Sequence, residues 1–126
     1  MAVPKSVFPK DERVFDKIKE LRNTITEAKH ELAFLCAQHL MTLVAATFDV
    51  AVSDITSDCR RAAVVRARFA YCLYRYNSNI KITAIADEVC KDHSTVSHAV
   101  RKAKNLLIFD SEFLSDYNKI KRDYEA

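Results

Sequence analysis

Two histidines, three hydroxyl side chains and four basic side chains lie together in residues 90–104, which form the segment CKDHSTVSHAVRKAK. Three kinds of chemistry use such side chains. A metal site uses imidazole and thiolate groups, and a nucleophilic or phosphate-transferring enzyme uses a hydroxyl or thiol near a histidine. A DNA-recognition helix uses short polar side chains with basic side chains around them. The rest of the sequence bears on the choice among the three.

Metal-ligand spacing occurs twice, at Cys36-x-x-His39 and at Cys90-x-x-His93. The signal is weak, because cysteine is often a small core residue and the chain contains no Cys-x-x-Cys pair. No cysteine–histidine pair lies in a recognisable nucleophile pattern. We therefore predict no metal site, no cofactor, no catalytic residues and no enzymatic activity.

Glycine is absent from the 126-residue chain, which has two prolines, Pro4 and Pro9. Phosphate-cradling loops need positive φ and close backbone approach, so we expect no nucleotide-binding loop and no bound nucleotide. Tight β-hairpins also usually rely on glycine. Hydrophobic residues make up 49% of the sequence, enough for a core. The composition predicts an all-α fold.

No secretory signal is visible at the N-terminus, and four cysteines in such a chain indicate reduced thiols in a cytoplasm. The most apolar run, residues 32–52, contains Gln38, His39 and Asp49. We interpret it as a buried helix and expect no membrane association.

Positive charge is concentrated in the middle of the chain. Residues 58–104 carry ten Lys and Arg against four Asp and Glu, a net charge of +6, whereas residues 1–57 carry −1 and residues 105–126 carry −2. Such a distribution favours a localised site for a polyanion, although a solvated basic surface without a ligand has the same signature.

Apolar periodicity divides the chain into three parts. Residues 1–10 have the composition of a disordered leader, residues 11–39 form a helical extension, and residues 40–126 form a domain. The extension has a heptad seam, which predicts either a homodimer contact or a helix packed on its own domain. The seam residues proposed for dimerisation are Val14, Ile18, Leu21, Ile25 and Leu32.

Two helices joined by about three residues are predicted near 82–89 and from residue 93 onward, an outline typical of a helix-turn-helix. Asp92, His93, Ser94 and Thr95 occupy the start of the second helix, which such motifs present to base edges. Asp92 could equally cap the helix. Arg60 and Arg61 precede a helix and are candidates for a minor-groove or phosphate contact. Candidates for DNA backbone contacts are Arg66, Arg68, Arg75, Lys91, His98, Arg101 and Lys102.

The segments VVRARFAYCLYRY and ITAIADEVCKDHSTVSHAVRKAKNLL resemble the C-terminal DNA-binding domain of the bacterial replication initiator DnaA. That family has an Arg-rich helix followed by a helix-turn-helix whose second helix opens with RDH[ST]TVxHAxRK, and this chain has KDHSTVSHAVRK at 91–102. The resemblance covers roughly residues 40–122.

The resemblance implies a Trp-repressor-like domain that binds double-stranded DNA at DnaA-box-like sites. It places Asp92, His93, Ser94 and Thr95 against bases in the major groove, and Val96 close to the DNA. It also matches Arg60 to a minor-groove arginine and Arg68 to a backbone-contacting arginine.

The sequence also departs from the family pattern. The family's Gly-Gly pair before RDH is replaced by Cys90 alone, so the turn is one residue shorter, and Phe69 and Thr83 stand where the family has Gln and Pro. These changes affect the register and the preferred box more than binding itself.

We expect a sequence-specific DNA-binding regulator of replication initiation or transcription, associated with the nucleoid and without ATPase activity. The alternative is a protein-interaction module that keeps the fold but no longer recognises bases, and that binds a partner through its N-terminal helix.

Overall fold

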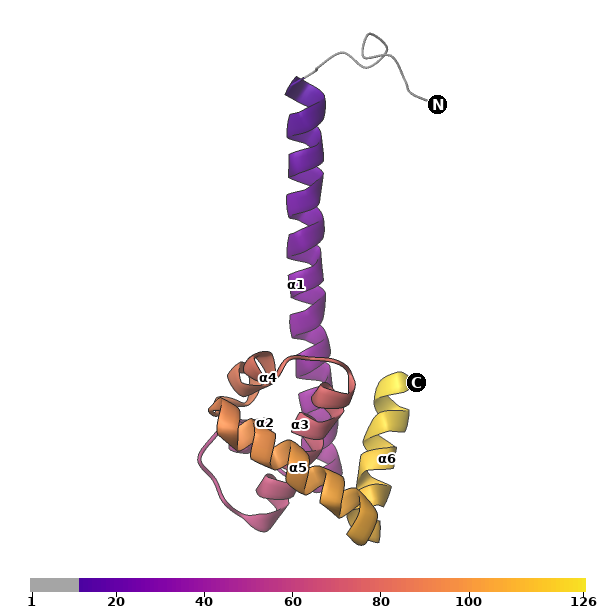
Figure 1. The fold of residues 1–126 in the computed structure, drawn as a ribbon. Coiled ribbons are helices and arrows are strands. Elements are labelled where there is room, and N and C mark those ends of the chain that lie inside the picture. Colours follow the sequence, from indigo (N-terminus) through magenta and orange to yellow (C-terminus); the bar gives the residue numbers. More distant parts are fainter. Residues whose placement is uncertain (1–11) are drawn as a thin grey trace, which may run out of the picture. The chain divides into compact units, whose positions relative to one another are not determined.

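The computed structural model describes residues 12–126, which are helical with short connections and contain no strand (Figure 1). The prediction of an all-α fold is confirmed. The predicted leader, residues 1–10, lies outside the described residues. The helices are α1 (Glu12–Phe48), α2 (Val52–Ile55), α3 (Ala62–Asn77), α4 (Ile82–Val89), α5 (His93–Phe109) and α6 (Ser111–Glu125).

The chain divides into two units with a boundary between Leu35 and Cys36, which falls within α1. In the first unit, every described side chain from residue 12 to residue 35 is exposed. The large apolar side chains of this stretch keep between 41% and 63% of their surface exposed, so burial stabilises them little.

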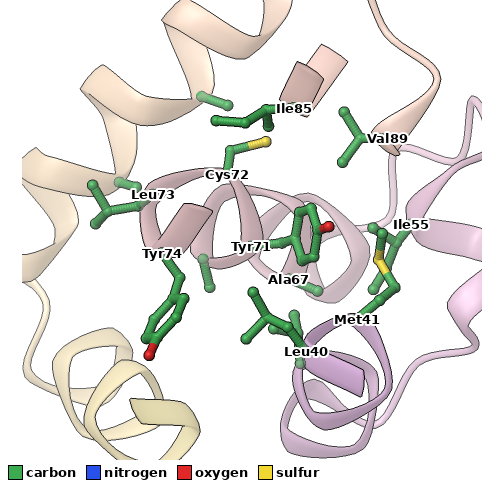
Figure 2. Packing of buried hydrophobic residues seen from close by; sticks show 14 of the residues in the cluster. Leu40, Met41, Ile55, Ala67, Tyr71, Cys72, Leu73, Tyr74, Ile85 and Val89 are labelled. Atoms are coloured by element: carbon green, nitrogen blue, oxygen red, sulfur yellow. The ribbon is translucent and has the colours of Figure 1, made fainter. Parts of the chain in front are cut away.

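The core of the second unit is built around α3, which packs against α2, α4, α5 and α6. Tyr71 and Ala67 of α3 face Leu40 and Met41 of α1, whereas Cys72 lies on the other side of α3, near Ile85 (Figure 2). Burial of each large apolar side chain stabilises the fold by roughly 1.5–3 kcal/mol. The helix-turn-helix segment is thus fixed to a core helix rather than to a loop.

By length and composition alone, α1 is apolar enough to cross a membrane, with a mean hydropathy of 1.4 over an 18-residue window. The part of α1 in the second unit nevertheless contributes Leu40, Met41, Val44 and Ala45 to the protein core. For the C-terminal part of the run 32–52, this packing supports its interpretation as a buried helix.

Three residues other than glycine take up left-handed backbone conformations, at Asp49 (φ 55°), Asn79 (φ 64°) and Cys90 (φ 57°). Aspartate and asparagine adopt this conformation more readily than other residues with a Cβ. Cys90 ends α4 and has no such advantage. At these helix ends, residues with a Cβ therefore adopt the left-handed conformation that glycine usually adopts. The conformational free-energy cost is highest for Cys90.

Replacement of Cys90 by glycine tests this cost. We expect Cys90→Gly to raise the free energy of unfolding by about 0.5–1 kcal/mol, because glycine adopts positive φ without a Cβ clash. Urea denaturation monitored by circular dichroism measures the change. Cys90→Val is the matched control and should lower stability, since a β-branched residue is disfavoured at positive φ. Equal stability of the two variants would contradict the assignment.

Candidate nucleic-acid interface

The helix-turn-helix consists of α4 and α5, joined by residues 90–92. The backbone N–H of Cys90 donates to the Asp87 carbonyl at 3.4 Å, and the N–H of Lys91 donates to the Ala86 carbonyl at 3.0 Å. These bonds close the end of α4 and need the left-handed conformation of Cys90. The shortened turn is therefore compatible with a helix-turn-helix.

Asp92 caps the N-terminus of α5. Its Oδ1 accepts hydrogen bonds from the Thr95 backbone N–H at 2.7 Å and from the Ser94 hydroxyl at 3.0 Å. Hydrogen bonds from Thr95, through its side chain and then its backbone, and from Ser94 hold the pKa of the Asp92 carboxyl below its ordinary value. Of the two roles considered for Asp92, the structure supports capping; a base contact stays a prediction.

The first turn of α5 presents three polar side chains to solvent, those of His93, Ser94 and Thr95. Val96 is different, because its side chain is fully buried in the core. This burial does not favour the DNA contact predicted for Val96, which stays a prediction. Its position follows from helical periodicity, since it begins the buried stripe that continues through Ala99, Val100 and Ala103.

Farther along α5, the exposed side chains of His98, Arg101, Lys102 and Asn105 line a shallow, open surface hollow. They lie on the solvent side of the helix that carries His93, Ser94 and Thr95. Polar groups able to contact bases and cations able to contact phosphates thus share one helix.

The loop before α3 carries the second candidate group. Arg60 is exposed. Arg61 Nη2 lies 3.0 Å from Asp54 Oδ2, and both side chains are substantially exposed. An ion pair this exposed contributes little to stability, so Arg61 can exchange its carboxylate partner for a phosphate at small cost.

Arg68 does not lie on this surface. It is buried, and its Nε donates to the Ile55 carbonyl at 2.8 Å. Its Nη2 lies within hydrogen-bonding distance of three more carbonyls, those of Asp54, Ser57 and Cys59. The guanidinium thus holds the chain between α2 and α3 in place, which does not favour the phosphate contact predicted for Arg68; that contact stays a prediction.

Arg75, which is buried, and Arg66, which is half-buried, also pair with carboxylates of the protein. Arg75 donates to Glu88 through Nε at 2.8 Å and Nη2 at 2.6 Å, and the Tyr71 hydroxyl donates to the same carboxylate at 2.7 Å. Arg66 Nη1 lies 2.8 Å from Asp110 Oδ2. These pairs join α3 to α4 and to the start of α6, so they do not favour the backbone contacts predicted for Arg75 and Arg66, which stay predictions.

Lys91 bridges two segments that are far apart in the sequence. Its Nζ donates to the Ser57 carbonyl at 2.5 Å and to Asp58 Oδ1 at 3.1 Å, and its side chain is only 14% exposed. These contacts do not favour the phosphate contact predicted for Lys91. Ser57 and Asp58 could not be found from the sequence, because a backbone carbonyl has no sequence signature and the partners are more than thirty residues apart.

Within residues 12–126, no three or more His, Cys, Asp or Glu side chains are grouped so as to hold a metal ion. The Cys-x-x-His spacings found in the sequence therefore do not assemble into a four-ligand cluster among the described residues.

A comparison with known protein families identifies a match. Residues 37–103 match the family described as the bacterial dnaA protein helix-turn-helix, which is more than half of the 126-residue chain. The matched region includes the loop with Arg60, all of α3 and α4, and the polar start of α5.

The buried position of Arg68 predicts that its removal destabilises the fold. We expect Arg68→Ala to lower the free energy of unfolding by about 2–4 kcal/mol, because it leaves several carbonyls without their charged donor. Urea denaturation measures this, with Arg101→Ala on exposed α5 as the control, expected within about 0.5 kcal/mol of the parent. Full stability of Arg68→Ala combined with equal weakening for all duplexes would restore the phosphate role.

Proposed function

The chain belongs to the bacterial DnaA helix-turn-helix family, and from this premise we propose that it binds double-stranded DNA sequence-specifically at DnaA-box-like sites. DNA binding itself is the property of the family. The single observation that carries the finer proposal is the exposed polar first turn of α5, where His93, Ser94 and Thr95 follow a capping aspartate.

In the proposed complex, the first turn of α5 enters the major groove. Hydroxyl and imidazole groups donate or accept hydrogen bonds at base edges, and the Thr95 methyl group suits the thymine methyl. Because these side chains are short, the helix backbone can approach the bases closely. Asp92 holds this turn in helical form. It also orients Ser94, because it accepts a hydrogen bond from the Ser94 hydroxyl.

Arg60 is proposed to enter the adjacent minor groove. It is exposed and lies next to Arg61, in the loop that precedes α3. A cation in a narrow minor groove gains from its enhanced negative potential, which favours A/T-rich sites.

Phosphate contacts are proposed for the exposed cations and the imidazole on the solvent side of α5, together with Arg61. These residues are Arg61, His98, Arg101 and Lys102. Phosphate contacts fix the orientation of the domain on DNA but carry no sequence information directly.

We further propose that the protein acts as a homodimer through the seam of α1. Val14, Ile18, Leu21, Ile25 and Leu32 are between 41% and 63% exposed. Assigned to heptad positions, Ile18 and Ile25 occupy position a and Leu21 occupies position d, an arrangement that favours two-stranded coiled coils. Two DNA-binding domains in one dimer would suit a regulator of replication initiation or transcription that acts without hydrolysing ATP.

A second candidate function, an interaction module without base recognition, is favoured by the same exposed seam. Its partner would then be a different protein chain rather than a second copy. Salt dependence separates this candidate from the first, because several phosphate contacts make affinity fall steeply with ionic strength.

Fluorescence anisotropy with a DnaA-box duplex and a scrambled duplex, at ~50 and ~200 mM salt, tests the proposed DNA recognition. We expect Ser94→Ala to reduce the free-energy difference between the two duplexes by roughly 1–3 kcal/mol, because a base contact is lost. Ser115→Ala, an exposed serine of α6, is the matched control. No preference of the parent protein for the box would reject sequence-specific binding.

Light scattering tests the dimer. The parent should have about twice the monomer mass of 14.4 kDa. Replacing Ile18, Leu21 and Ile25 together by glutamate should give monomers, since charges in an apolar seam oppose association. Replacing Lys19, Asn23 and Thr26 by glutamate changes other faces of the same helix and should keep the parent's mass. A monomeric parent would rule out the dimer.

A further inference from the structure

The Ser57 carbonyl is a shared acceptor for cations from two different elements. Arg68 of α3 donates to it through Nη2 at 3.0 Å, and Lys91 of the α4–α5 turn donates through Nζ at 2.5 Å. The loop between α2 and α3 is therefore attached both to the core helix and to the helix-turn-helix.

Lys91 is well placed to hold the loop between α2 and α3 in a defined position relative to the helix-turn-helix. Its side chain is 14% exposed, and lysine is seldom buried unless its charge is paired. The pairing is supplied by Asp58 at 3.1 Å, whose own carboxyl pKa is lowered by the hydrogen bond and charge of Lys91. Two of the three ammonium donors are thus directed into the loop.

The two ends of this bridge adjoin the two proposed DNA contacts. Asp58 is two residues before Arg60, the proposed minor-groove residue. Lys91 directly precedes Asp92, the cap of α5, and so adjoins the turn proposed for the major groove. A bond between Lys91 and residues 57–58 therefore fixes the distance between the loop and the start of α5.

We propose that Lys91 is a positioning residue, which holds the Arg60 loop against the start of α5 so that both grooves are contacted by one preformed unit. This inference rests on the proposed DNA recognition. Its physical basis is preorganisation, since a loop that is already fixed before binding loses less conformational freedom when the complex forms.

A phosphate-contacting lysine would behave differently. It would contribute to binding of every duplex, and its loss would reduce the dependence of log K on log salt by about one contact. Loss of a positioning lysine would release the loop in the free protein and lower the preference for the box. The number of phosphate contacts would be unchanged.

The first measurement uses the free protein, so it does not depend on DNA binding. Hydrogen exchange is followed at the amide of Ser57, which donates to the Asp54 carbonyl, and at that of Cys59, which donates to the Ser57 hydroxyl. In Lys91→Met, whose unbranched side chain is close to lysine in length but has no donors, both amides should exchange faster. The control is Lys119→Met, an exposed lysine of α6, which should leave both rates unchanged.

The second measurement is anisotropy with the box and scrambled duplexes at two salt concentrations. Lys91→Met should lower the box-to-scrambled affinity ratio about tenfold, equivalent to about 1.4 kcal/mol, with an unchanged salt slope. Lys91→Arg should restore the ratio, because a guanidinium can donate to both the carbonyl and the carboxylate. Lys102→Met, at a proposed phosphate contact, should instead reduce the salt slope and keep the ratio.

Unchanged exchange at Ser57 and Cys59 in Lys91→Met would overturn the proposal, as would a reduced salt slope with an unchanged ratio. If the parent protein shows no box preference, the proposed function fails, whereas the exchange rates still decide whether Lys91 fixes the loop. If Lys91→Met does not fold, Asp58→Asn takes its place, because the Asp58 side chain is fully exposed and its change should not disturb the core. The exchange rates and the box-to-scrambled ratio are expected to change in the same directions.

Discussion

Helix α3 is buried through most of its length, and its buried arginines must therefore find hydrogen-bond partners inside the protein. Arg68 meets this requirement with backbone carbonyls before α3, and Arg75 meets it with the carboxylate of Glu88 in α4. No buried side-chain nitrogen or oxygen in the described residues is left without a partner. The loop, the core helix and the helix-turn-helix are thus placed relative to one another by the need to satisfy two buried charges.

Several features could be predicted from the sequence because they depend on local periodicity and composition. The absence of glycine indicated an all-α fold, and the apolar spacing around residues 82–107 indicated the helix-turn-helix. The polar residues His93, Ser94 and Thr95 are exposed as their spacing predicts. Val96 belongs to the buried stripe that the same spacing marked, and only the family resemblance had placed it near DNA.

The roles of the arginines could not be assigned in this way, because the charge of an arginine does not reveal which acceptor it binds. Arg68 binds carbonyls, which every residue has, and Arg66 binds Asp110, which lies 44 positions later. Within residues 58–104, four of the ten basic residues have acceptors inside the protein and are at most partly exposed. These are Arg66, Arg68, Arg75 and Lys91. The positive charge available to a polyanion is consequently more localised than the count of basic residues over 58–104 suggests. It is centred on α5 and on the loop before α3.

The exposure of every described side chain from residue 12 to residue 35 bears on how the protein responds to its own concentration. A helix of this length without buried contacts relies on local terms, such as the ion pair of Lys17 and Glu20 at 3.6 Å, and is marginally stable in water. If this segment associates as proposed, helix formation and association become one equilibrium. The amount of protein in the cell then sets both the helicity of the segment and the number of DNA-binding domains that act together.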